Sequence, residues 1–133
     1  MFSLYPEFRA VLGRHMGRIG IDIGGSGVKA VRLDETGRRS CARVPYITPD
    51  IDALASAISE AAGEVGLRTT DAFGVCAPGV LDQKRGEVVH AVNLPCLSGV
   101  RVGELVAKTC GMQGVGAVLT DAIASGLGSW RLA

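Results

Sequence analysis

The chain has 133 residues, of which 47% are hydrophobic and 20% charged, so it is long and apolar enough for one domain with a buried core. Its 14 basic and 13 acidic residues leave a net charge of +1, which gives no electrostatic footprint for nucleic acid. No apolar run approaches the length of a membrane span, and the start lacks a secretory signal. We therefore expect a cytoplasmic protein with no membrane partner.

The elements are predicted in chain order from hydrophobic periodicity and turn residues. Residues 1–17 are expected to be an extension, with Met16 as an alternative start. The first half of the fold then consists of strands at 18–23 and 27–34, a turn at 34–37, a third strand at 38–45 and an amphipathic helix at 50–65. The second half consists of a strand at 71–76, a loop hairpin at 80–92, a helix at 102–110, a strand at 115–119 and a further helix from Asp121 onward.

This order predicts an α/β fold in which three antiparallel strands are followed by strands that alternate with helices. The sheet is therefore mixed and flanked by helices. No internal repeat or low-complexity linker divides the chain, so residues 18–133 are expected to form one unit. The cysteines form no C-x-x-C pair, and the two histidines add no zinc spacing, so small buried thiols are expected at Cys41, Cys76, Cys96 and Cys110.

The most informative segment is a glycine turn between the first two predicted strands. Gly24, Gly25 and Gly27 can adopt positive φ and leave successive N–H groups bare, so that with Ser26 they can surround phosphate oxygens. Asp22 before the turn can hold Mg²⁺ through its water shell, and Lys29 after it adds a positive charge. A glycine-rich turn without a ligand fits an isolated glycine cluster about as well, but the acid at the end of an apolar run favours a ligand.

Neither common glycine motif is present. A P-loop requires four residues between its glycines, and a dinucleotide fingerprint requires a helix after the turn. Here a strand-like alternation of Val28, Ala30 and Val31 with Lys29 and Arg32 follows Gly27.

Three further stretches lie at expected strand ends, where open α/β sheets bind ligands. Pro78 and Gly79 form a turn that either exposes backbone to a ligand or simply reverses the chain. Asn93 suits a sugar hydroxyl, but it equally suits an Asx-turn before Pro95. Asp121 follows Thr120 at a strand-to-helix junction, where position alone favours a helix N-cap over a base that accepts the proton of an attacking hydroxyl.

Together these stretches resemble the ROK family of sugar kinases (repressor, open reading frame, kinase), and the glucokinase-like members in particular. The resemblance covers about residues 18–130. The family's phosphate motif resembles residues 22–29, its Pro-Gly loop 74–79, its hairpin and Asn-Leu-Pro element 86–95, and its Asn-Asp-Ala motif 120–122.

The resemblance implies one lobe of the actin–hexokinase–Hsp70 fold, with ATP and Mg²⁺ as cofactors and a hexose as substrate. It implies Asp121 as the catalytic base, and Thr120 and Asp121 at the sugar together with Pro78, Gly79 and Asn93. It places the phosphates at the loop, with Asp22 at the metal and Lys29 nearby. Thr120 stands where the family has asparagine, and no counterpart of the second lobe is present. We therefore expect an N-terminal lobe with little kinase activity alone.

Two other interpretations stay open. The chain could be a fragment of a ROK-family sugar-responsive repressor, although the roughly 17 residues ahead of the first predicted strand are too few for a helix-turn-helix. It could also be a non-catalytic lobe that associates with itself or with another chain. The phosphoryl donor is expected to be ATP, with polyphosphate used by some relatives.

Overall fold

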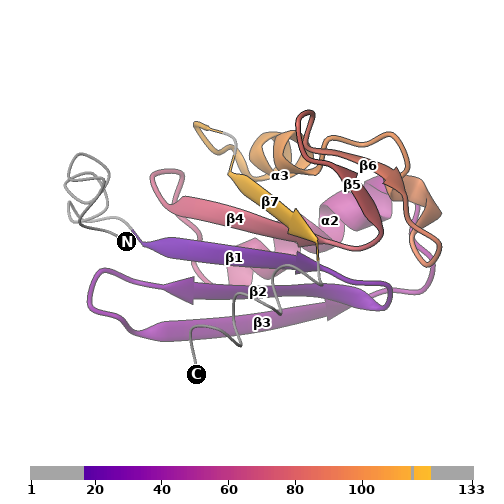
Figure 1. Cartoon of the computed structure of the whole chain (residues 1–133). Coiled ribbons are helices and arrows are strands. Elements are labelled where there is room, and N and C mark those ends of the chain that lie inside the picture. The colour runs from indigo at the N-terminus through magenta and orange to yellow at the C-terminus, as the bar shows by residue number, and fades with distance from the viewer. Residues whose placement is uncertain (1–16, 115, 121–133) are drawn as a thin grey trace, which may run out of the picture.

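The computed structural model describes residues 17–114 and 116–120, which form a five-stranded mixed sheet, a two-stranded ribbon, two α-helices and a short 3-10 helix (Figure 1). The order of the main sheet is β3-β2-β1-β4-β7, and β5 pairs with β6. The strands are β1 (Arg18–Ile23), β2 (Gly27–Leu33), β3 (Arg39–Pro45), β4 (Ala72–Ala77), β5 (Val80–Asp82), β6 (Glu87–His90) and β7 (Ala117–Thr120). The helices are α2 (Ile51–Glu64), the 3-10 helix η2 (Pro95–Leu97) and α3 (Val102–Cys110).

The predicted α/β class and mixed sheet are confirmed. β1, β2 and β3 form an antiparallel meander, whereas β1, β4 and β7 run parallel, with crossovers through α2 and α3. The short helix η2 was not predicted. Residues 1–16 of the extension expected at 1–17, and the helix expected from Asp121, lie outside the described residues.

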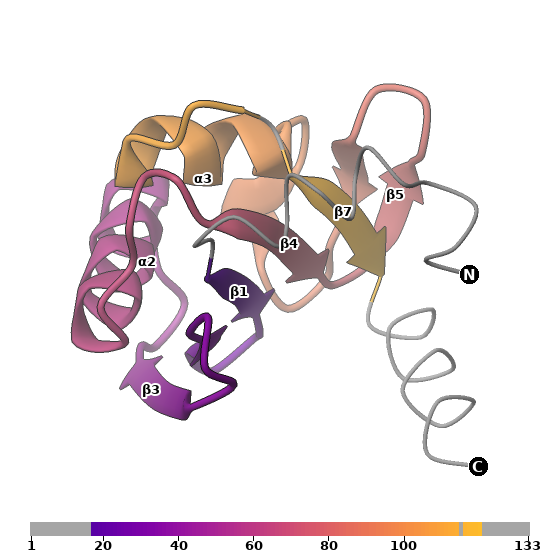
Figure 2. The same ribbon diagram turned by 90° about the vertical axis from the view of Figure 1, so that its left-hand side faces the viewer.

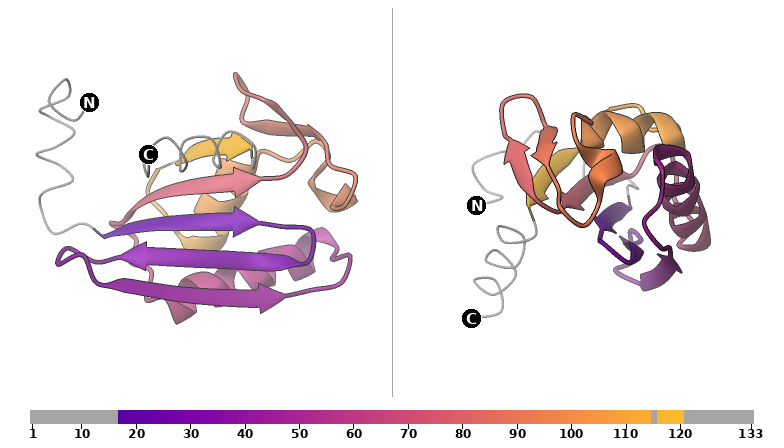
Figure 3. Two further views of the ribbon diagram at one scale, coloured as in Figure 1. Left: turned by 60° about the horizontal axis from the view of Figure 1, so that its bottom comes forward. Right: turned by 90° about the vertical axis from the view of Figure 1, so that its right-hand side faces the viewer.

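The two described helices cover the same face of the sheet (Figures 2 and 3). α2 packs on β1, β2 and β3, and α3 packs on β4 and β7. Alternate strand residues such as Ile21 and Val28 point into the layer between helices and sheet, where Leu54 and Ile58 of α2 are fully buried. Burial of one such side chain contributes about 1.5–3 kcal/mol. No helix in the described ranges is both long and apolar enough to cross a bilayer.

The start of α2 depends on a side-chain cap. Asp50 has extended backbone, and its Oδ1 accepts a hydrogen bond of 2.7 Å from the backbone N–H of Ala53. Replacement of Asp50 by alanine is expected to lower the free energy of unfolding by about 1 kcal/mol. Urea unfolding measures this, with Asp52→Ala as the control, because Asp52 lies in the first turn but is not the cap. Equal effects of the two substitutions would contradict the cap.

The sequence did not predict a buried ion pair at the amino ends of β1 and β4. The Arg32 guanidinium donates to both oxygens of Asp71, over 2.7 Å to Oδ2 and 3.0 Å to Oδ1. The backbone N–H of Arg68 also donates to Asp71, over 2.9 Å. A Cβ atom at Gly17 would lie 2.5 Å from Arg32 Nη2, so the absence of a side chain there leaves room for the pair. The pair links β2 to the turn that precedes β4.

The expectation of buried cysteines is wrong. All four are free thiols, Cys41 is exposed and the other three are half-buried. Cys41 is exposed because it lies on the edge strand β3, on the face away from the helices. Burial raises the pKa of the Cys96 and Cys110 thiols.

Candidate functional site

The glycine loop after β1 is held tightly by its own backbone and by Tyr46, the residue that follows β3. The N–H of Gly24 donates to the carbonyl oxygen of Gly27 over 2.9 Å. The Tyr46 hydroxyl donates to the carbonyl oxygen of Gly24, and the Tyr46 N–H donates to that of Ser26 over 3.0 Å. The loop is therefore bound to the end of β3.

One of the two reasons predicted for the loop glycines, a positive φ, is wrong. None of Gly24, Gly25 and Gly27 has a positive φ. A Cβ atom on Gly27 would instead lie 2.7 Å from the carbonyl oxygen of Val44, and one on Gly24 would lie 3.1 Å from that of Gly27. Close approach of backbone, and not left-handed geometry, therefore accounts for glycine at positions 24 and 27.

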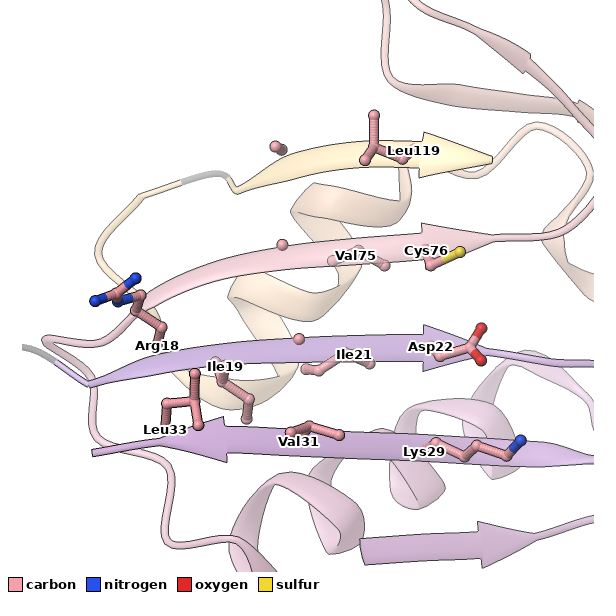
Figure 4. Close-up of a pocket in the computed structure, with 13 residues that line it drawn as sticks. Arg18, Ile19, Ile21, Asp22, Lys29, Val31, Leu33, Val75, Cys76 and Leu119 are labelled. Atoms are coloured by element: carbon pink, nitrogen blue, oxygen red, sulfur yellow. The ribbon is translucent and has the colours of Figure 1, made fainter. Parts of the chain in front are cut away.

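Asp22, Lys29 and Cys76 lie side by side at one end of the sheet (Figure 4). Asp22 of β1 is the register partner of Lys29 on β2 and of Cys76 on β4. Asp22 and Cys76 are half-buried, and Lys29 is exposed. All three lie on the face away from the helices. The structure thus brings Asp22, the predicted metal-binding acid, together with the positive charge of Lys29, next to the glycine loop.

A groove of about 550 Å³ continues from these residues along the same face. It becomes apolar away from Asp22, where Val31 and Leu33 are 41% and 37% exposed. Leu119 of β7 lines the groove on the other side (Figure 4). The groove is therefore apolar in its middle, with Asp22 and Lys29 at one end and Arg18 at the other (Figure 4).

The Pro78–Gly79 turn connects the end of β4 to the ribbon. Gly79 has φ +86°, and a Cβ atom there would overlap the carbonyl oxygen of His90 and lie 3.0 Å from the Cα atom of Ala91. The turn therefore lies directly against the end of β6, from which the chain leads to Asn93.

Asn93 reaches the glycine loop. A Cβ atom on Gly25 would lie 3.3 Å from the Cβ atom of Asn93, and both residues are exposed. Thr120 is half-buried at the end of β7, where it pairs with Ala77, and Asp121 lies outside the described residues. The loop, the Pro78–Gly79 turn and Asn93 thus meet at the carboxyl ends of β1 and β4, as expected for ligand sites in open α/β sheets.

Tyr46 is the residue of this region that the sequence analysis missed. Its ring is half-buried, and burial raises the pKa of the hydroxyl to about 12, with smaller contributions from Cys96 and Asp22. The phenol therefore stays protonated and donates its hydrogen bond at neutral pH. Its position in the sequence could have indicated this role, because Tyr46 directly follows β3, and β3 pairs with β2, the strand that begins at the end of the glycine loop.

No cluster of three or more metal-ligating side chains is present among residues 17–114 and 116–120. Asp22 is thus a single carboxylate beside a loop with bare N–H groups. That donor set suits Mg²⁺, which commonly takes one or two protein carboxylates and completes its shell with phosphates and water.

No protein-family model and no curated protein matches the sequence. Among solved structures, the ROK hexokinase from Thermus thermophilus is 28% identical, with a TM-score of 0.61 over 80% of this chain and 36% of that one. The ROK-family glucokinase from Streptomyces griseus, in complex with glucose and AMPPNP, is 30% identical, with a TM-score of 0.60 over 78% of this chain and 32% of that one.

A ROK-family transcriptional regulator, a homolog of the Escherichia coli MLC protein, shares the fold. It is 12% identical, with a TM-score of 0.56 over 81% of this chain and 28% of that one. The chain thus spans about a third of the length of the kinases that it matches.

Proposed function

Because the chain shares its fold with ROK-family hexose kinases to which it is 28% and 30% identical, we propose that it supplies the phosphate- and sugar-binding lobe of an ATP-dependent hexose kinase of the glucokinase type. The reaction would transfer the γ-phosphoryl group of ATP to a sugar hydroxyl. ATP as a substrate is compatible with a cytoplasmic protein. The proposal applies to the lobe, and the activity of a whole kinase depends on more than this chain contains.

One observation carries the proposal: the phosphate loop and the predicted sugar residue are in contact. Gly25 lies against Asn93, so a phosphoryl group at the loop and a hydroxyl at Asn93 would be neighbours. Phosphoryl transfer is accelerated mainly by positioning and charge neutralisation, and contact between two binding elements provides positioning.

ATP and Mg²⁺ fit the residues at this end of the sheet. The N–H groups of the loop would hold phosphate oxygens, Lys29 would add positive charge and Asp22 would hold the metal through water. The metal, when bound, neutralises charge on the phosphates. Asn93 and the Pro78–Gly79 turn would orient the sugar.

Asp121 would accept the proton of the attacking hydroxyl. It directly follows Thr120 at the carboxyl end of β7, the strand that pairs with β4. Thr120 offers a hydroxyl where an amide is expected, so it would make fewer hydrogen bonds to the sugar.

A titration and a coupled assay test the proposal. In ¹⁵N NMR spectra of the chain, glucose is expected to shift the amides of Gly79 and Asn93, whereas the open-chain polyol sorbitol is not. In a coupled assay with glucose, ATP and Mg²⁺, Asp121→Asn is expected to lower any phosphorylation by at least ~100-fold, the smallest contribution of a general base. Asp82, whose side chain is 38% exposed, provides the control substitution Asp82→Asn, which is expected to change neither result.

The outcomes separate three cases. Phosphorylation that Asp121→Asn abolishes would support a working site with Asp121 as its base. Glucose binding at Asn93 without phosphorylation would support a lobe that requires a second part for chemistry. Glucose that shifts neither Gly79 nor Asn93 would contradict the proposal.

A sugar-sensing role is the second candidate, because the ROK transcriptional regulator has the same fold. A sensor would bind the sugar without phosphorylating it, so Asp121→Asn would change no reaction. Self-association of the lobe is a further proposal, which sedimentation at several concentrations would test.

A further inference from the structure

Three carbonyl oxygens of the glycine loop are held by hydrogen bonds from within the fold. The oxygens of Gly24, Ser26 and Gly27 each accept a hydrogen bond, and two of the three donors belong to Tyr46. One donor is the side-chain hydroxyl and the other is the backbone N–H, so a single residue holds the loop at two points. The third donor is the N–H of Gly24.

The N–H groups on the other side of the loop have no such partners. For the N–H groups of Gly25 and Ser26, no acceptor is present in the described part of the chain, and both residues are exposed. An outward N–H attracts a phosphate oxygen, whereas an outward carbonyl oxygen repels it. The direction of each peptide in the loop therefore decides whether an anion can bind there.

The peptide between Gly24 and Gly25 is the one that the Tyr46 hydroxyl holds. Its carbonyl oxygen is the acceptor of that hydrogen bond, and its N–H belongs to Gly25, which is an exposed residue. Glycine on both sides gives this peptide little steric resistance to rotation. Without the hydroxyl, the inward direction of the carbonyl group loses the hydrogen bond that favours it.

The chain after Tyr46 is itself constrained. Ile47 is 94% exposed, Thr48 has φ +36° and Pro49 is buried. A β-branched residue in the left-handed region is strained, and such strain persists only where the surroundings fix the backbone. The exposure of Ile47 shows that the chain gains no apolar burial there, while the neighbouring Tyr46 and Pro49 are held inward.

We propose that Tyr46 is the positioning residue of the phosphate loop, which keeps the Gly24–Gly25 peptide turned so that the N–H group of Gly25 faces an anion. The proposal rests on the proposed function, since it assumes that the loop binds the phosphate chain of a nucleotide. Tyr46 acts through the loop and does not contact the phosphates.

Tripolyphosphate is the probe for a direct test, because it carries the phosphate chain without adenosine. Its dissociation constant is measured from the Gly25 and Ser26 amide shifts in ¹⁵N NMR spectra of the whole chain. Tyr46→Phe is expected to raise the dissociation constant about five- to tenfold, as loss of one hydrogen bond implies. The matched control is Thr36→Val, which removes the hydroxyl that donates to Asp34 at the far end of the β2–β3 hairpin.

The free energy of unfolding is measured for each variant, because a purely structural tyrosine would change stability and leave the dissociation constant unaltered. Equal tripolyphosphate affinity of Tyr46→Phe and the unmodified chain would overturn the role of Tyr46, while the phosphate loop would stand. Absence of any binding by the unmodified chain would overturn the loop and its positioning residue together. The inference would also be overturned if tripolyphosphate shifted other amide signals of the unmodified chain but not those of Gly25 and Ser26. This measurement needs no variant.

Discussion

Asp71→Asn is expected to lower the free energy of unfolding by about 3–5 kcal/mol, the cost of removing one partner of a buried ion pair. The Asp71 side chain is fully buried, and the Arg32 side chain is 10% exposed. The substitution leaves the guanidinium charge in the interior without an opposing charge, and water cannot compensate it fully. Urea unfolding at neutral pH measures the loss.

Asp82→Asn is the matched control. Asp82 also accepts backbone N–H groups, those of Lys84 and Arg85, and also lies near an arginine, with Arg85 Nε at 4.0 Å. Both side chains of this second pair are exposed, so its loss is expected to cost less than about 1 kcal/mol. Similar losses for the two substitutions would contradict the importance of burial at Asp71.

The pH dependence follows from the direction of the shift at Asp71. Burial raises the pKa of this carboxyl. The pKa is lowered by more than that amount by the hydrogen bond from Arg32, by those from the backbone N–H groups of Arg68 and Gly17, and by the arginine charge. The net pKa is therefore below its ordinary value. A lowered pKa stabilises the folded state above the unfolded pKa of about 3.9, and this stabilisation is lost as the pH falls through the folded value. The difference in stability between the unmodified chain and Asp71→Asn is therefore expected to shrink below about pH 4.

Gly79→Ala is expected to have the second large effect, a loss of about 2–5 kcal/mol from backbone strain and steric overlap combined. The positive φ alone disfavours alanine, and the new methyl group would overlap the His90 carbonyl oxygen, which cannot rotate away. The end of β6 must then move, and Asn93 with it. We therefore expect weaker glucose binding as well as lower stability.

Gly37→Ala separates the two causes. Gly37 has the same φ of +86°, but no atom lies within 4 Å of the position of its Cβ atom. Its replacement is expected to cost about 1 kcal/mol, from the left-handed backbone alone. If Gly79→Ala and Gly37→Ala cost the same, the contact between the Pro78–Gly79 turn and β6 contributes nothing.

Much of the fold could be predicted because its signals are local. The alternation of isoleucine in β1 and the periodic apolar residues of α2 identify these elements. Gly37 and Gly111, both with positive φ, mark the turn between β2 and β3 and the end of α3. The Arg32–Asp71 pair could not be predicted in this way, because it joins residues 39 positions apart. Alternation shows only that Arg32 points to the buried face, and it does not say which acid lies there.

The sequence predicted which residues lie at the site, but it did not predict the contacts that require those residue types. Gly27 is required because the backbone of Val44 approaches it, a contact that depends on the pairing of β2 with β3. Tyr46 carries no motif, and its role depends on the direction of a peptide in another segment. Sequence patterns report residue types at intervals, whereas these features arise from tertiary contact.

The strand order has a consequence for aggregation, since each outer strand of an open sheet exposes backbone groups to which a strand of another molecule can pair. The outer strand β3 carries Arg39 and Arg43, both exposed, and ends at Pro45, which has no N–H to donate. The other outer strand, β7, has no charged residue but is only four residues long. Charge and proline at one edge, and shortness at the other, therefore oppose strand-to-strand polymerisation of the lobe.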